Sequence, residues 1–357
     1  MKKTLLILLL PLFVFGLDVE NSLHIRGFAT LDATLNTSKG VAPTYLPNTN
    51  EDILKQDDVN YNYSSFGLQL DFDLSNSIDF MTQAIYSKGE SNEAYEVDLP
   101  WAMLGYNFGD DYKIRVGKMK VPFMKGTETR NINYSFLWAR PQVLEKGVNG
   151  FNDLYGLDLL KKTYIEDVDL EFQFTVGKAE HQLEIDENNY YYSMSALASY
   201  DNSWIRLSFG QTSFDQISRI DGSTIAKDVI IDFGSIEAKL SMNSWLLQAG
   251  YANTNNDTIA DTKYTYASLA YEFDEITPYL LYSKTSIDSL PFGTPPNIEK
   301  NGYSINQQHS VGMRYDFHRN FALKLQYEYK LYEQKQFDTV QEETSYNIYS
   351  ITLDMVF

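Results

Sequence analysis

Positively charged side chains gather in one part of an otherwise acidic chain. The segment 113–162 holds ten Lys or Arg and four Asp or Glu, a net of +6, whereas the whole chain of 357 residues carries −19. The remaining residues therefore sum to −25. Cations grouped along a confined aqueous path concentrate anions and could select solutes. The residues we expect to do this are Arg115, Lys118, Lys120, Lys125, Arg130 and Arg140, with Glu128 opposing them.

The segment that carries these cations begins as a strand and then loses its alternation. Ile114 and Val116 alternate with Lys113 and Arg115, so the two pairs point to opposite faces of a strand. If the apolar face meets lipid, Arg115 points inward, because a charge that faces lipid at mid-membrane costs about 2–4 kcal/mol. A long irregular connection follows over about 122–153, and such a connection in a compact fold needs a functional reason. We expect it to fold inward as a constriction; the alternative is a solvated cap outside.

Other residue types that commonly do chemistry are scattered. Cysteine is absent, and no histidine has a second ligand at metal spacing, so we expect neither a zinc site nor any other cofactor. His309 and Ser310 are adjacent, but neighbours on a strand face opposite ways, which argues against a hydrolase. Acidic clusters at 51–58 and 186–187 could hold Ca²⁺ or Mg²⁺, although solvated loops explain them better. The four histidines are His24, His181, His309 and His318.

The first sixteen residues read as an export signal. Lys2 and Lys3 precede an apolar run over 4–15, and Gly16 offers a small residue for cleavage. A membrane-spanning anchor is the alternative, but a span needs about 20 apolar residues and this run is shorter. We therefore expect a Sec-type signal peptide over 1–16 and a single domain over 17–357.

The dominant period in the rest of the chain is two. In the segment 65–74, Phe, Leu, Leu, Phe and Leu alternate with Ser, Gly, Gln, Asp and Asp, and the same pattern returns at 321–331. One face of each strand is thus apolar and the other polar. We predict sixteen strands, at 23–36, 62–74, 78–88, 96–109, 112–121, 154–164, 168–179, 190–200, 203–213, 228–241, 244–254, 263–273, 276–287, 306–317, 320–335 and 345–357.

The connections between these strands alternate between short and long. Tight turns such as 110–111 and 201–202 alternate with long connections such as 37–61 and 122–153. This order is typical of outer-membrane barrels and is not expected of a β-sandwich or propeller. Aromatic residues make up 15% of the chain and flank the short turns, although the mean hydropathy is −0.34. Rings at one end of the strands predict an interfacial girdle.

In these features the chain resembles the sixteen-stranded trimeric porins of Gram-negative bacteria. The signal, the alternating loops and the aromatic-terminated ending ITLDMVF over 351–357 carry that likeness. The stretch RVGKMKVPFMKGTETR over 115–130, followed by WARP over 138–141, is similar to the loop-3 region of phosphate-selective and dicarboxylate-type porins. The dense run of arginines expected of a phosphate channel is missing here. The likeness implies a homotrimer in the outer membrane, in contact with lipid and lipopolysaccharide.

We therefore expect an all-β transmembrane barrel that passes small hydrophilic solutes by passive diffusion, with a preference for anions and without catalysis. The acidic balance of the chain argues against nucleic acid as a partner. Three alternatives remain open: a non-conducting barrel that serves as an adhesin or structural protein, an outer-membrane hydrolase, and a cation-preferring porin. The third gains support from the −25 outside segment 113–162, which would draw cations to the mouth.

Overall fold

The structure is a computed structural model of the chain. It describes residues 17–19, 22–38, 41–43, 53–55, 57–88, 95–140, 151–181, 189–217, 224–256, 260–289, 302–336 and 339–357. The predicted signal over 1–16 lies outside these residues.

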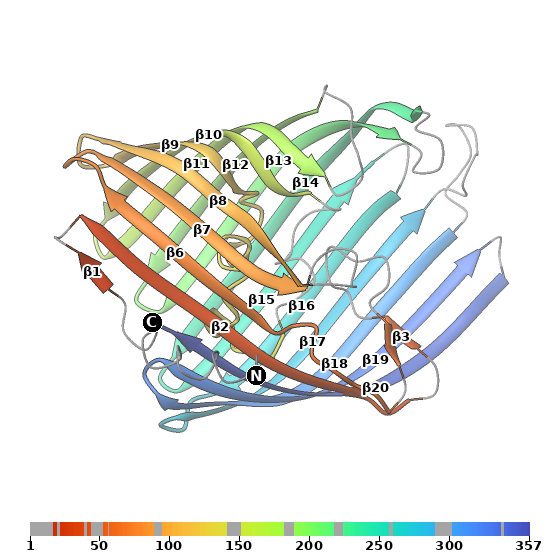
Figure 1. Ribbon diagram of the computed structural model, residues 1–357. Coiled ribbons are helices and arrows are strands. Elements are labelled where there is room, and N and C mark those ends of the chain that lie inside the picture. The colour runs from red at the N-terminus through yellow and green to blue at the C-terminus, as the bar shows by residue number, and fades with distance from the viewer. Residues whose placement is uncertain are drawn as a thin grey trace, which may run out of the picture.

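Sixteen long antiparallel strands form one closed sheet, which confirms the predicted barrel and its strand count (Figure 1). Each long strand pairs with the next along the chain, and the last pairs with the first to close the ring. The strands are β2 (Leu23–Asn36), β6 (Ser65–Asp73), β7 (Ile78–Lys88), β8 (Tyr95–Phe108), β9 (Tyr112–Lys120), β10 (Phe151–Ile165), β11 (Val168–His181), β12 (Tyr190–Tyr200), β13 (Ser203–Ile217), β14 (Thr224–Met242), β15 (Trp245–Asn255), β16 (Ala260–Tyr271), β17 (Ile276–Ser289), β18 (Gly302–His318), β19 (Phe321–Gln336) and β20 (Thr339–Val356).

Shorter elements decorate this ring. Two small strands, β1 (Leu17–Val19) and β5 (Val59–Asn60), add to β2, and β3 (Val41–Pro43) pairs with β4 (Ile53–Lys55) in a hairpin of its own. The helices among the described residues are two short 3₁₀ turns between β9 and β10. No helix in the described part of the chain is long and apolar enough to cross a membrane.

The barrel is apolar outside and polar inside, as the period-two alternation predicts. On β19, Lys324, Gln326 and Glu328 are at most 4% exposed, whereas Leu325 between them is 40% exposed. On β2, Leu31 is 57% exposed. This is the reverse of a water-soluble domain, in which charges are outside and leucines are buried. An outer surface of this kind suits contact with lipid.

The short turns gather at one end of the barrel, which we call the short-turn end. Glu166, Asp201, Asn243 and Asp274 adopt positive φ angles of 49–54° there, one in each of four tight hairpins. Left-handed backbone lets a strand reverse within two residues, and Asp and Asn tolerate it better than most residues do. The opposite end is the long-loop end.

The barrel closes at the last residue of the chain. The amide of Gly27 donates to the carbonyl of Phe357 at 2.8 Å, and the amide of Phe357 donates to the carbonyl of Gly27 at 2.9 Å. The ring of Phe357 lies directly over Gly27, where an added Cβ would be 2.1 Å from a ring carbon. Glycine is therefore required at this seam, because any side chain would displace the terminal ring.

Candidate functional site

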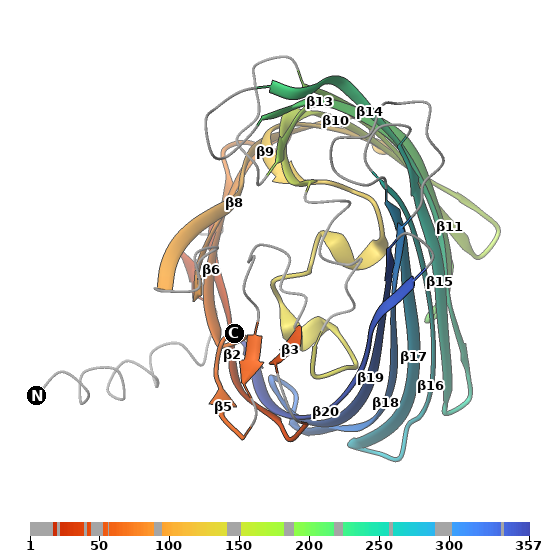
Figure 2. The ribbon, with the colours of Figure 1, turned by 90° about the vertical axis from the view of Figure 1, so that its right-hand side faces the viewer.

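The segment that follows β9 turns into the barrel instead of continuing the wall. Residues 121–140, which we call the inner loop, cross the interior of the ring (Figure 2). The predicted loop extended over 122–153, of which 141–150 lie outside the described residues and β10 begins at Phe151. The inner loop contains both 3₁₀ turns, η2 (Lys125–Thr127) and η3 (Asn133–Ser135).

Apolar side chains of the inner loop pack against aromatic side chains of the wall. Phe123 lies edge-on to Phe233 of β14, with ring centroids 5.4 Å apart, and Trp138 lies edge-on to Tyr266 of β16 at 5.7 Å. Phe123 is 0% exposed and Trp138 is 1% exposed. Burial of these large rings stabilises the inner loop inside the barrel.

The first limb of the inner loop is hydrogen-bonded to β13 and β14. The guanidinium of Arg206 donates to the carbonyl of Pro122 at 3.3 Å, and the hydroxyl of Ser235 donates to the carbonyl of Phe123 at 2.8 Å. The amide of Lys125 donates to Glu237 at 3.1 Å. The loop therefore enters the barrel along the inner face of β13 and β14.

Among the predicted residues, Arg115 lies on the inner face of β9 and forms a two-carboxylate contact. It pairs with Asp158, directly opposite on β10, and its Nε donates to that carboxylate at 2.7 Å. It also lies 3.6 Å from Glu128 of the inner loop. Asp158 is fully buried and Arg115 is 12% exposed, so this pair within the wall lies in a poorly solvated place. The contact between Arg115 and Glu128 connects the inner loop to the wall.

Asp153, at the start of β10, gathers three more of the predicted cations. Lys120 forms a close ion pair with it, and Lys118 and Arg130 each lie 3.6 Å away. Lys120 and Arg130 are only 2% and 8% exposed. Lys118 also lies over the ring of Tyr155, an outward side chain that is 54% exposed, at 5.5 Å from the ring centroid.

These four cations are balanced by an equal number of carboxylates, so they do not form a bare basic ring. We call these four cations and their four carboxylate partners the wall cluster. Because each charge has a partner within 4.0 Å, the field that the cluster projects into water is weak. Its members are Arg115, Lys118, Lys120 and Arg130 with Asp98, Glu128, Asp153 and Asp158.

Arg140 lies far from the wall cluster, beside β19 and β20. It is 5% exposed, donates to the hydroxyl of Ser350 at 2.5 Å and lies 3.6 Å from Glu328. Its guanidinium also faces the ring of Tyr63 at 5.2 Å. The structure therefore does not bring Arg140 together with the cations near β9.

Lys125 is the predicted cation with the most open surroundings. Its ammonium lies 5.2 Å from the centre of the Trp204 ring, near the short-turn end. Burial, together with the guanidinium of Arg206, lowers the pKa of Lys125 from its ordinary value, although Glu171 and Glu237 partly offset this. Lys125 is half-buried, so it can meet solutes that reach this part of the lumen.

Several functional residues were missed by the sequence reasoning. Arg206 on the inner face of β13 is 4% exposed and donates to neutral oxygens, among them the amide oxygen of Gln173 at 3.1 Å. The alternation of the predicted strand 203–213 places it inside, which was the available signal. Asp153 and Asp158 were counted only as opposing charge, because no pattern in the sequence pairs them with particular cations.

Metal and hydrolase chemistry gain no support from the geometry. No group of three or more His, Asp or Glu among the described residues could hold a metal ion. His309 lies against the outward ring of Tyr282, with centroids 5.1 Å apart, whereas Ser310 is buried on the inner face. A nucleophile and its base must share a face, and this pair does not.

No protein-family model matches this sequence, and neither does any curated protein. Solved structures do match its fold. A loop-deletion mutant of OmpT, an outer membrane protein of Vibrio cholerae, is 12% identical with a TM-score of 0.61, over 94% of this chain and 99% of that one. OprB of Pseudomonas putida is 10% identical with a TM-score of 0.61, over 95% of each chain.

An anion-selective porin from Comamonas acidovorans is 13% identical with a TM-score of 0.57, over 94% of this chain and 99% of that one. OmpT has also been solved in a trimer form, which is 11% identical with a TM-score of 0.56, over 94% of this chain and all of that one. These matches cover nearly the whole of both chains at low identity. The chain therefore has the fold of the sixteen-stranded outer-membrane porins.

Proposed function

We propose that the protein is an outer-membrane porin: a water-filled channel for passive diffusion of small hydrophilic solutes, without catalysis. The observation that carries this proposal is the inverted distribution of side chains on a closed ring. Lys324 and Glu328 are buried inside, while Leu31 and Ile351 are 57% and 44% exposed outside. A ring that meets lipid outside and is polar inside suits a path for solutes that lipid excludes.

The same proposal includes export by a signal over 1–16, residence in a Gram-negative outer membrane beside lipopolysaccharide, and assembly as a homotrimer. OmpT of Vibrio cholerae, one of the structural neighbours, occurs in a trimer form. Chemical crosslinking in native membranes tests this part. Crosslinked species at three times the mass of the mature chain support it, and exclusively monomeric barrels contradict it.

We further propose that the inner loop is the constriction and that it gives a weak preference for anions. Lys125 and Arg206 support the direction, because Lys125 borders the lumen and Arg206 lies beside it. Glu237, which faces Arg206 across β13 and β14, offsets part of their charge. The weakness follows from the wall cluster, whose cations are matched by carboxylates. One structural neighbour is an anion-selective porin, which agrees with this direction.

Planar-bilayer recording tests the channel itself. We expect stepwise conductance from the purified barrel and, in a salt gradient, a reversal potential displaced slightly toward the anion value. A folded barrel that gives no steps would indicate the adhesin or structural alternative. Conductance steps with a reversal potential near the cation value would support the porin function and contradict the anion preference.

A further inference from the structure

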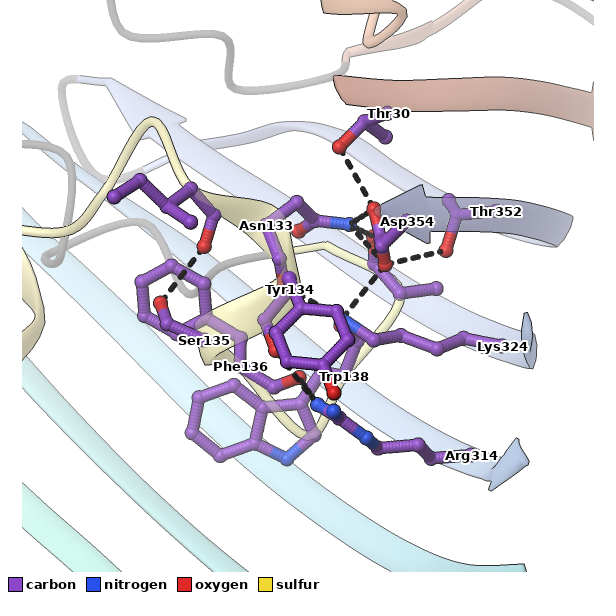
Figure 3. A network of polar contacts seen from close by, with 12 residues as sticks. Thr30, Asn133, Tyr134, Ser135, Phe136, Trp138, Arg314, Lys324, Thr352 and Asp354 are labelled. Carbon is purple, nitrogen blue, oxygen red and sulfur yellow. Dashed lines mark hydrogen bonds and ion pairs between the residues drawn. The ribbon is translucent and has the colours of Figure 1, made fainter. Parts of the chain in front are cut away.

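Two cations of the barrel wall face each other directly across neighbouring strands. Arg314 of β18 is the register partner of Lys324 of β19, and both point inward. Like charges in this position destabilise a sheet. The carboxylates of Asp316 and Asp354 offset their charge, and main-chain carbonyls of the second limb of the inner loop, residues 133–139, accept their remaining hydrogen bonds (Figure 3).

Lys324 has an acceptor for each of its three ammonium protons. It donates to the carbonyl of Asn133 at 2.6 Å and to the carbonyl of Trp138 at 3.1 Å, and it pairs with Asp354 of β20 at 2.9 Å. Lys324 and Asp354 are both 0% exposed. An ammonium offers three donors, so this one is saturated by two main-chain oxygens of the loop and one carboxylate.

Arg314 holds the same limb at two further carbonyls. Its Nη1 donates to Tyr134 at 2.7 Å and to Phe136 at 2.8 Å, while its other nitrogens donate to Asp316 at 2.8–3.0 Å. The guanidinium also lies 4.7 Å from the centre of the Tyr134 ring. Two wall cations thus bind four main-chain carbonyls of the loop.

Two side-chain contacts complete the attachment. Asn133 donates to the carboxylate of Asp354 at 2.9 Å, and Tyr134 donates to the carbonyl of Arg319 at 2.9 Å. Arg319 belongs to the tight turn between β18 and β19, so the second limb reaches the short-turn end of the barrel.

We propose that Arg314 and Lys324 are positioning residues that fix the width of the channel by holding residues 133–139 against β18–β20. This inference rests on the proposed porin function. It assigns the size limit of the channel to two residues of the barrel wall. The cations grip main-chain carbonyls, so the attachment depends on the wall residues more than on the side chains of the loop. If the limb moved away, two facing cations would lose four acceptors, which strongly favours the attached state.

The principal test replaces Lys324 by Met, which keeps most of the volume and removes the charge. We expect single-channel conductance to fall by about twofold with larger current noise, because the limb leaves the wall and enters the lumen. The matched control is Lys239→Met, which removes an inward-facing lysine of β14. Among the described residues, none of the hydrogen bonds or ion pairs of Lys239 goes to the inner loop. We expect its conductance to stay near that of the wild type.

A tether separates positioning from a general structural role. The chain has no cysteine, so Ala139→Cys and Gln326→Cys can be bridged by a short bifunctional thiol reagent. The amide of Ala139 lies 3.1 Å from the side-chain oxygen of Gln326, so the two sites are close. Bridging should raise the conductance of the Lys324→Met channel back toward that of the wild type. Equal conductance in the Lys324→Met and Lys239→Met channels, or no effect of bridging, would overturn the proposal.

A second readout does not depend on conduction. A spin label at Leu137 reports mobility of the limb in the folded barrel, and we expect it to become mobile in Lys324→Met and to stay immobile in Lys239→Met. If the wild type forms no channel, the porin function fails while this readout still decides the attachment. Where Lys324→Met does not fold, Arg314→Met, which leaves the Lys324–Asp354 pair in place, takes its place in each measurement.

Discussion

The inner loop is held at its two ends by opposite chemistry. In the wall cluster, four cations meet four carboxylates, so side-chain charge is cancelled by side-chain charge. Along the second limb, the wall cations Arg314 and Lys324 donate hydrogen bonds to main-chain carbonyls of the loop. In the proposed channel, the first arrangement determines the charge that a solute meets, and the second determines the width of the path. A basic segment in the sequence therefore does not translate into a basic pore.

The largest effect is expected when the carboxylate at the centre of the wall cluster is removed. Asp153→Asn leaves Lys120 and Arg130 buried without their shared partner, and we expect a loss of about 3–5 kcal/mol in the free energy of unfolding. Urea unfolding in lipid vesicles measures it. Asp98→Asn is the control, since Asp98 is 53% exposed and 4.0 Å from Lys118. A loss of similar size in both variants would show that the cluster is not a buried network.

A smaller effect is expected from the two wall cations of the second limb. Arg314→Met and Lys324→Met each remove hydrogen-bond donors to the loop, but each also relieves the repulsion between the two cations. Because the double variant gains this relief only once, we expect it to lose more stability than the two single losses combined, by about 0.5–3 kcal/mol. A double-mutant cycle from the same unfolding measurements gives this coupling. Strict additivity would mean that the facing cations do not interact.

The smallest effect concerns Lys125, which stands between the two regions. We expect Lys125→Gln to change stability by less than about 0.5 kcal/mol and to move the reversal potential toward cations. The pKa of Lys125 is lowered from 10.5, so its charge is lost as pH rises through a value below 10.5. The anion preference of the wild type should therefore fade in that alkaline range. Lys125→Gln should show no such change, and a pH profile shared by both proteins would remove Lys125 from the selectivity.

Strand positions were predictable because alternation is a local signal. The predicted strands 23–36, 78–88 and 190–200 coincide with β2, β7 and β12. Strands at the long-loop end run further than predicted: the last begins at Thr339 instead of 345, since residues 341–344 are all polar and break the apolar alternation. Backbone pairing there continues beyond the apolar pattern that marks a membrane crossing.

The partners of the cations were not predictable in the same way. Arg115 and Asp158 lie directly opposite, but the inner loop separates them in sequence and hides the register. The alternation of the predicted strand 320–335 places Lys324 on the inner face. It does not distinguish a lysine that faces water from one that binds a loop carbonyl. Single-strand periodicity decides which face a side chain occupies. The partners that the side chain contacts there depend on the path of the inner loop, whose sequence has no periodic pattern.

The seam between Gly27 and Phe357 also constrains when the barrel can form. The hydroxyl of Thr30 donates to Asp354 across 324 residues of sequence, so the first strand must wait for the last one before its inner face is complete. Contacts of such long range form slowly. A sheet in which the first and last strands have not yet paired is open and has two unpaired edges, which are prone to pair with other chains. Pairing of β2 with β20 removes both exposed edges at once.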